Sequence, residues 1–345
     1  MLKLRFLDLS FRTAYAQAKE LALAQSEIPL LTPGTVRVEE RSGRQFAYRY
    51  RYDATGKRIT EYLGAMSDSA TTGRIEHAHE EIKDFKTIAQ YSLQLRKIGF
   101  YSADNSTLVT VASLFNSGIF GGGGMLIGTH AFGAIMNELG VSASPFPMTE
   151  DLDVARTRRI ELAAVPKGGL LDLLKSTGLP FHEVPSLKRG AQATSFKVRG
   201  RKLKVDLLVP TTKAPYKPVA VKELGAHALG LPHLDYLLKE SIPSVLIGRD
   251  RIVPIAVPNP GLFCLHKLAM FSLRPSADSS KREKDVLQAA ALAAALMNEE
   301  DFRLAEAIDG INTAIRKRIR PGAKQAAKVL TDNYPEAAEI VATLA

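Results

Sequence analysis

Two acidic residues are spaced for metal chemistry on a β-strand. Asp151 and Asp153 are two residues apart, so on a strand both carboxylates project from one face. Their neighbours Leu152 and Val154 then point into the core. Paired carboxylates suit Mg²⁺, which binds through one or two carboxylates together with substrate phosphates. An Asp-x-Asp pair is weak evidence by itself, because solvated pairs of this kind are common at strand ends.

A third acid, Asp206, strengthens the evidence for a metal site. It lies in the apolar run Lys-Leu-Lys-Val-Asp-Leu-Leu-Val, where a buried carboxylate is costly unless a partner or a metal ion satisfies it. Carboxylates from adjacent strands can hold two metal ions, one activating an attacking hydroxyl and the other holding the leaving phosphates. We therefore predict that Asp151, Asp153 and Asp206 bind two Mg²⁺ ions, with Mn²⁺ as an alternative.

A glycine turn that can hold a phosphate precedes these acids. Gly128 and Thr129 end a short apolar run and open a helical pattern, so free backbone N–H groups and the helix dipole can face a phosphate there. Glycine lets the phosphate approach the backbone closely, and the Thr129 hydroxyl is an additional donor. The alternative is an ordinary strand-to-helix turn, but the acids downstream favour nucleotide binding.

The elements that must position these residues fall into three segments. Strand and helix patterns alternate over 118–255, whereas only helical patterns follow, including separate helices over 312–319 and 323–332. We predict an α+β fold with a mixed-sheet core over 118–255. A small β-meander with helices over 1–117 and a C-terminal helical domain over 256–345 complete it.

The meander is predicted from strand-like runs at 35–40, 45–53 and 57–63, separated by turn sequences. In the central run, alternation places on one face Phe46, Tyr48, Tyr50 and Tyr52. The other face carries Ala47, Arg49 and Arg51. One interpretation is a nucleic-acid platform with stacking aromatics and phosphate-binding arginines. We favour the other, in which the aromatic face packs on a helix and the arginines are solvated, because so small a sheet must bury a face.

The composition limits the environment and the partners of the chain. A net charge of +10 favours a polyanionic partner such as RNA. The single cysteine, Cys264, rules out an internal disulfide framework. The sequence shows no signal-peptide pattern and no apolar run of the roughly 18 residues that a membrane span needs. We therefore predict a soluble cytoplasmic protein without membrane contact.

The glycine turn and the acids together resemble a family signature. Their order and approximate spacing resemble the signature of the polymerase-beta-like nucleotidyltransferase superfamily. The residues that match are Gly128-Thr129, Asp151-Leu152-Asp153 and Asp206. The resemblance covers roughly residues 118–290 and implies a nucleotidyltransferase-like mixed sheet. It also implies a Mg²⁺-dependent, two-metal reaction that moves NMP from an NTP to a hydroxyl acceptor and releases pyrophosphate.

Further matches are similar to the bacterial abortive-infection and toxin-type nucleotidyltransferases. In that group a small hydroxyl residue and an acid precede the Asp-x-Asp pair, and Thr149 and Glu150 stand at these positions here. Lys267 and Asp285 resemble its lysine helix and its basic-Asp motif. By this resemblance Lys267 would lie near the triphosphate, Asp285 would serve catalysis near the acceptor, and Asp206 would help deprotonate the acceptor hydroxyl.

The expected acceptor is RNA, including tRNA, and a protein hydroxyl is second. The alternative is a catalytically silent nucleic-acid-binding protein on the same scaffold, which would bind with strong salt dependence and show no metal-dependent NTP affinity. A third, weaker possibility is a metal-dependent phosphohydrolase that uses the same acids.

Overall fold

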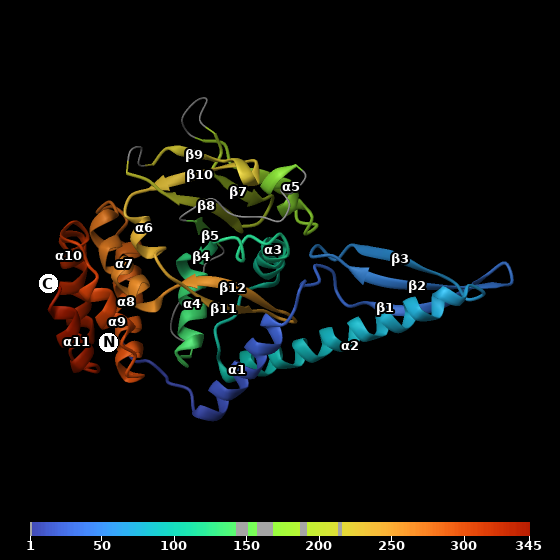
Figure 1. Ribbon diagram of the computed structural model, residues 1–345, viewed down its shortest axis with the longest axis horizontal. Helices are drawn as coiled ribbons and strands as arrows, with labels where there is room; N and C mark the ends of the chain where they lie inside the picture. Colours follow the sequence, from blue (N-terminus) through green and yellow to red (C-terminus); the bar gives the residue numbers. More distant parts are fainter. Residues whose placement is uncertain (1, 143–150, 157–167, 187–191, 213–215) are drawn as a thin grey trace.

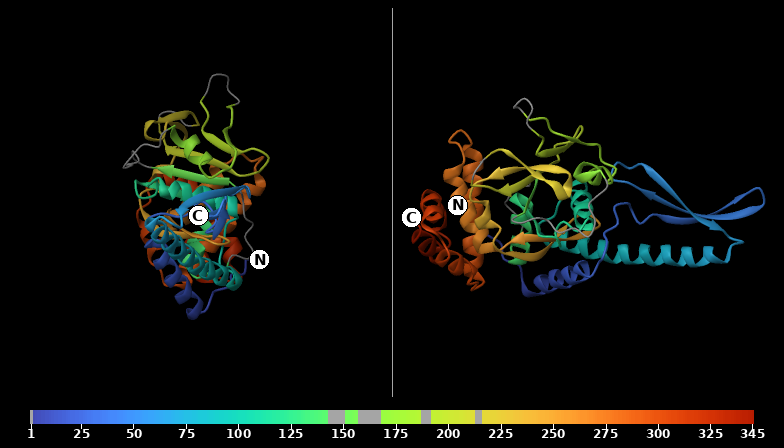
Figure 2. Two further views of the ribbon diagram at one scale, coloured as in Figure 1. Left: turned by 90° about the vertical axis from the view of Figure 1, so that its right-hand side faces the viewer. Right: turned by 45° about the horizontal axis from the view of Figure 1, so that its top comes forward.

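The chain begins with a helix, a three-stranded sheet and a long helix. The computed structural model describes residues 2–142, 151–156, 168–186, 192–212 and 216–345. The first elements are α1 (Leu9–Leu23), β1 (Thr35–Arg41), β2 (Arg44–Tyr52), β3 (Arg58–Ala65) and α2 (Ser69–Ile98). The strands form an antiparallel meander in the order β1-β2-β3, as predicted. The meander and the N-terminal half of α2 project away from the rest of the molecule (Figures 1 and 2).

The meander packs on α2 through the face opposite to the one expected. Ala47 is buried in a cluster with Ala78 of α2, and Arg49 is only 3% exposed. The Arg49 guanidinium donates to the Pro33 carbonyl at 2.9 Å and pairs with Glu81. The prediction that the aromatic face is covered and the arginines are solvated is therefore wrong. Its physical reason is that a guanidinium bound to a carboxylate and a carbonyl can be buried, and a small alanine lets the sheet approach the helix.

The central sheet contains the predicted acids. Its strands are β4 (Gly124–Ile127), β5 (Asp151–Arg156), β6 (Phe181–Glu183), β7 (Ser195–Val198), β8 (Lys204–Pro210), β9 (Pro218–Val221) and β10 (Ala226–Leu231). They follow the order β4-β5-β8-β10-β9, with β6 and β7 joined to β8. β5 and β10 run parallel to β8, whereas β7 runs antiparallel to it. Leu152 and Val154 of β5 are buried, as alternation predicts.

Helices lie below and at both sides of this sheet in Figure 1, and a hairpin lies below it. The helices are α3 (Asn105–Asn116), α4 (Gly128–Glu138), α5 (Gly169–Lys175) and α6 (Leu234–Leu237), and the hairpin is β11 (Ser241–Ile247) with β12 (Ile252–Pro258). Five C-terminal helices follow: α7 (Pro260–Leu273), α8 (Ser279–Asn298), α9 (Arg303–Asp309), α10 (Thr313–Leu330) and α11 (Pro335–Ala342). The first of these, α7, begins directly after β12, so the helical layer is tied closely to the strands.

α10 is continuous where the sequence predicts two helices. It runs through Pro321, which is flanked by the fully buried Ile319 and Ala323. Their packing outweighs the single backbone hydrogen bond that a proline removes. At Gly322 a Cβ atom would come within 2.2 Å of the Leu268 carbonyl oxygen, so glycine lets α10 lie directly against α7.

The observed architecture confirms the predicted α+β class with a mixed-sheet core. The division at residues 117 and 255 stays a prediction. Among the helices within the described ranges, none combines the length and the apolar character required to cross a membrane.

Candidate active site

Asp153 and Asp206 lie side by side in the central sheet. The parallel register of β5 and β8 pairs these two residues directly. On the other side of Asp153, antiparallel β4 places Ile127, so the Gly128 turn that follows borders the same carboxylate. Asp151 lies on the same face at the exposed start of β5. The sheet thus places Asp153 and Asp206 side by side near the predicted glycine turn, and Asp151 at the start of the same strand.

Gly128 is required at the turn for two reasons. Its φ is +73°, in the left-handed region that favours glycine. A Cβ atom at this position would lie 2.2 Å from Oδ2 of Asp153. The absence of a side chain therefore lets the Asp153 carboxylate lie against the backbone where α4 begins. Ile127, which precedes the helix, provides no side-chain cap for its first N–H groups.

Asp206 is held by two residues that the sequence did not single out. Ser195 Oγ donates to Asp206 Oδ1 at 2.5 Å, and Lys204 Nζ lies 2.7 Å from Oδ2. Burial and the negative charge of Asp206 raise the pKa of Asp153 to about 6, against the opposing charge of Lys267. Two neighbouring carboxylates that repel each other in this way form a site that a bound cation stabilises.

The acids fit a divalent ion as a pair of ligands. Within the described ranges, no three His, Cys, Asp or Glu side chains converge closely enough to hold a metal ion by themselves. Asp153 and Asp206 nevertheless place hard oxygen atoms next to each other on one face of the sheet. This donor set suits Mg²⁺, which takes its remaining ligands from phosphates and water.

The hydroxyl predicted to contact a phosphate is bound to a lysine. Lys284 Nζ of α8 donates to Thr129 Oγ1 at 2.9 Å, and Thr129 is 8% exposed. Burial and the nearby charge of Lys267 lower the pKa of Lys284. A cation from the helical layer thus reaches the start of α4, where a helix N-terminus already favours an anion.

Lys267 of α7 and Asp285 of α8 form a buried ion pair. Lys267 Nζ lies 3.0 Å from Asp285 Oδ1, and Arg274 Nε donates to Asp285 Oδ2 at 2.5 Å. The side chains of Lys267 and Asp285 are 8% and 2% exposed. Burial acts to raise the pKa of Asp285, but the charges and hydrogen bonds of Lys267 and Arg274 lower it below its usual range. The ionised carboxylate therefore fixes both cations.

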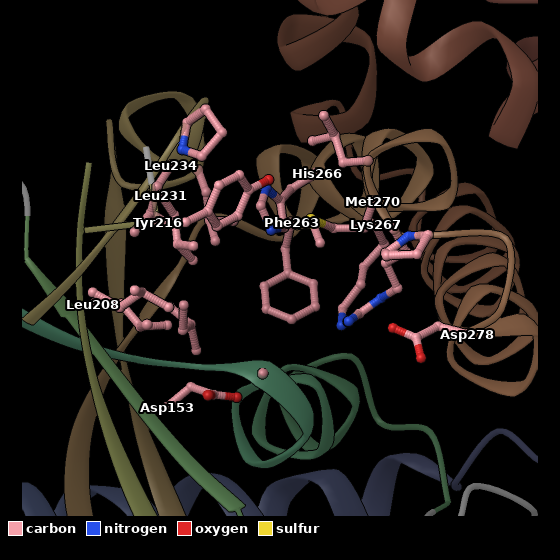
Figure 3. A pocket seen from close by; sticks show the side chains of 18 residues that line it. Asp153, Leu208, Tyr216, Leu231, Leu234, Phe263, His266, Lys267, Met270 and Asp278 are labelled. Atoms are coloured by element: carbon pink, nitrogen blue, oxygen red, sulfur yellow. The ribbon is translucent and has the colours of Figure 1, made fainter. Parts of the chain in front are cut away.

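A cavity of about 530 Å³ connects Asp153 of the sheet to these cations (Figure 3). Gly128, Asp153, Lys267 and Arg274 line its polar part. The remaining lining is largely apolar and includes Leu208, Tyr216, Leu229, Leu231, Leu234, Leu237 and Phe263. Figure 3 shows Leu208, Tyr216, Leu231 and Leu234 on one side of the cavity, and Lys267, Met270 and Asp278 on the other. This volume and mixed lining are typical of a small-molecule site.

The structure brings together most of the residues predicted for the site. Gly128, Asp153 and Lys267 share the cavity wall, and Asp206 adjoins Asp153. Thr129 follows the turn, and its hydroxyl accepts a hydrogen bond from Lys284 of the helical layer.

Other predicted residues lie away from the cavity wall. Asp285 is behind Lys267, and Asp151 stands at the exposed end of its strand. Thr149-Glu150, on which part of the toxin-type resemblance depends, lie outside the described residues.

Four residues of the arrangement were not predicted: Ser195, Lys204, Arg274 and Lys284. A sequence signal existed for two of them. Lys204 is two residues before Asp206, so strand alternation places both on one face. Lys284 directly precedes Asp285 in a basic stretch of the helix.

Comparison with known proteins agrees with this geometry. A family model described as Nucleotidyltransferase matches residues 106–312. The match contains the glycine turn, the acids and the Lys267–Asp285 pair, and leaves out α1, α2 and the meander. The comparisons found no curated protein and no solved structure that matches the chain. Because the family match spans more than half of the 345 residues, the chain belongs to the nucleotidyltransferase family.

Proposed function

We propose that this nucleotidyltransferase uses Mg²⁺ to move a nucleoside monophosphate from an NTP to a hydroxyl acceptor, with release of pyrophosphate. One observation carries the proposal: Asp153, which is paired with Asp206, lies beside the Gly128 turn on a cavity that Lys267 also lines. RNA, including tRNA, is the first candidate acceptor and a protein hydroxyl the second. The finer resemblance to toxin-type enzymes stays a prediction from the sequence.

The two parts of the cavity suit an NTP in one orientation. The apolar part, with Phe263 and Tyr216, would take the base and the ribose. The triphosphate would then extend toward Lys267 and Arg274, with Lys284 near the start of α4. Fixed cations of this kind neutralise phosphate oxygens and hold the reacting phosphorus in position.

The acids would act on the reacting atoms. Asp153 and Asp206 would hold Mg²⁺, which supplies charge neutralisation for the phosphates and the attacking oxygen. Asp151, at the exposed start of β5, stays a predicted third ligand. The acceptor oxygen forms a bond to the α-phosphorus, and the bond from this phosphorus to the oxygen that bridges to the β-phosphorus breaks. Pyrophosphate leaves with that bridging oxygen. Asp206 takes the proton of the acceptor hydroxyl.

Asp285 is better placed to position cations than to contact the acceptor. Its carboxylate is 2% exposed and binds both Lys267 and Arg274. We assign it the role of holding these two side chains toward the cavity, which revises the acceptor-side position that the resemblance implies.

The reaction can be tested by following a radiolabelled α-phosphate. The purified chain is incubated with each α-labelled NTP and total cellular RNA or protein, with Mg²⁺ or with EDTA. Transfer should require Mg²⁺ and should fall at least about 100-fold in Asp153→Asn and in Asp206→Asn. Asp332→Asn, which changes an exposed acid at the end of α10, is the matched control. Undiminished transfer in the two site variants would refute the mechanism, and phosphate release without a labelled acceptor would indicate a phosphohydrolase.

The catalytically silent alternative is separated by titration calorimetry. The enzyme should bind at least one NTP, and only when Mg²⁺ is present. A silent scaffold would bind nucleic acid with strong salt dependence and would show no metal-dependent NTP affinity.

A further inference from the structure

The uncovered face of the N-terminal meander combines aromatic rings with arginines. This face is the side of the sheet on which the aromatic residues of β2 lie. The strand register and the alternation of side chains identify the other residues on the same side. They are Thr35, Arg37, Glu39 and Arg41 of β1, Arg44, Phe46, Tyr48, Tyr50 and Tyr52 of β2, and Arg58, Thr60, Tyr62 and Ala65 of β3. We call this set the aromatic-arginine face. It lies outside the part of the chain that the family match covers.

The rings of the aromatic-arginine face form a connected platform. The centroid of the Tyr48 ring lies 5.4 Å from that of Tyr62 and 6.4 Å from that of Tyr50. The Phe46 ring lies 6.4 Å from that of Tyr62. Tyr62 is 57% exposed and Tyr52 is 45% exposed. Phe46, Tyr48 and Tyr50 are half-buried. Neighbouring rings that reach solvent offer stacking surfaces to flat molecules.

Positive charge accompanies the rings. The Arg41 guanidinium lies 5.0 Å from the centroid of Tyr48, and that of Arg58 lies 5.1 Å from the centroid of Tyr50. Glu39 is the single acid of the face as defined above, and it is already bound by the Tyr50 hydroxyl and by Arg41. The other arginines of the face therefore remain an excess of positive charge for an anionic partner.

The burial pattern of the meander is the reverse of what packing alone favours. α2 covers Ala47 and Arg49 of β2 and Leu63 of β3, while the aromatic side chains of β2 lie on the other face. Aromatic rings contribute more to a core than alanine does, and a buried guanidinium needs partners, here Glu81 and the Pro33 carbonyl. A sheet that served stability alone would cover the rings. The exposed rings therefore indicate a surface for a partner.

We propose that the aromatic-arginine face binds single-stranded nucleic acid, with unpaired bases stacked on the tyrosine rings and phosphates paired with the arginines. The chemistry favours this partner over a protein, because the face contains no Leu, Ile, Val or Met to form an apolar contact. It also favours a single strand over a duplex, since only unpaired bases expose their flat faces. The net charge of +10 agrees with a polyanion. Only the identification of this strand as the acceptor rests on the proposed function.

Binding can be measured with the full chain and a labelled single-stranded RNA of about 15 nucleotides. Fluorescence anisotropy gives the Kd for this strand, for DNA of the same sequence and for the matching duplex. The variant Tyr48→Ala with Tyr62→Ala should raise the Kd for the single strand at least about 25-fold. Tyr48→Phe with Tyr62→Phe keeps both rings and should stay within about threefold of the parent.

The arginines are tested through the salt dependence. Arg37→Gln with Arg58→Gln should reduce the slope of log Kd against log salt by about 1.4, since a single-strand phosphate contact contributes about 0.7. Phe302→Ala is the control for loss of an exposed aromatic side chain, because Phe302 is 76% exposed next to α9, at the opposite end of the molecule from the meander (Figure 1). Circular dichroism checks that every variant is folded.

Three outcomes would overturn this proposal. In the first, the parent chain prefers the duplex or binds no strand. In the second, Tyr48→Ala with Tyr62→Ala binds the single strand like the parent. In the third, the parent is a dimer, and the Ala variant dissociates this dimer but still binds the strand. Asp153→Asn separates the two proposals, because it should abolish transfer and leave strand affinity unchanged. Strand binding without transfer in the parent would refute the proposed function alone.

Discussion

The carboxylate of Asp153 occupies the space that a side chain at Gly128 would need, since a Cβ atom there would lie 2.2 Å from Asp153 Oδ2. The conformation of the turn and the position of the carboxylate are therefore fixed together. This relationship makes the turn as important for the site as the acids themselves.

Gly128→Ala should lower nucleotide transfer about 100-fold, because even a small displacement of Asp153 moves it away from the reacting atoms. Strain at φ +73° should also cost about 1 kcal/mol in the free energy of unfolding. Gly123→Ala is the matched control: its φ is +98°, but a Cβ atom there would meet nothing within 4 Å. That variant should lose stability and keep its transfer rate. An equal loss of transfer in both variants would contradict the role of the contact.

Lys284→Met should raise the KM for the NTP about tenfold, because it removes the cation bound to Thr129 at the start of α4. Steady-state kinetics with varied NTP measures the effect. Lys281→Met, which changes an exposed lysine on the same helix, should leave the KM within about twofold of the parent. The assignment fails if both variants shift the KM alike.

Asp285→Asn should lower the free energy of unfolding by about 3–5 kcal/mol, because it leaves the buried Lys267 cation without its counter-charge. Urea denaturation measures this change. The double variant Lys267→Met with Asp285→Leu should recover much of the stability, since it removes the buried charge as well. It should not recover NTP binding, because the cation is absent. Recovery of both properties would exclude Lys267 from the nucleotide site.

Acid should destabilise the protein through His266. Burial and the charge of Lys267 lower the pKa of this histidine to about 3, whereas the unfolded value is near 6.5. Below pH 6.5 the unfolded chain binds a proton that the folded chain does not, so the free energy of unfolding falls as the pH falls. The expected loss between pH 6.5 and pH 5 is roughly 1–2 kcal/mol.

His266→Gln should remove that part of the pH dependence in thermal unfolding scans at several pH values. His79→Gln, which changes an exposed histidine of α2, should retain it. If His266→Gln loses as much stability as the parent between pH 6.5 and pH 5, another group is responsible.

Strand alternation in the sequence predicted which residues share a face, but it did not predict which face is covered. The aromatic and arginine faces of β2 were identified correctly, and their burial was assigned the wrong way round. The deciding contact is between Arg49 and Glu81, which are 32 residues apart. Local periodicity carries no information about such a partner.

The same limit applies to the candidate site. Asp206 was predictable, because a carboxylate in an apolar strand is conspicuous. The contact between Lys284 and Thr129 was not, because it joins positions 155 residues apart and depends on how the helical layer packs on the sheet. The single helix α10 was missed for a similar reason, since the close approach at Gly322 involves Leu268 of another helix.

The division of charge between the two layers has a consequence for how the enzyme loses activity. The sheet supplies Asp153 and Asp206. Lys267 lies in α7, Arg274 directly follows that helix, and Lys284 lies in α8. A small separation of the layers would part the acids from the cations while every strand and helix remains formed. Mild heat or denaturant should therefore inactivate the protein before circular dichroism detects unfolding, and a saturating nucleotide, by bridging the layers, should bring the two transitions together.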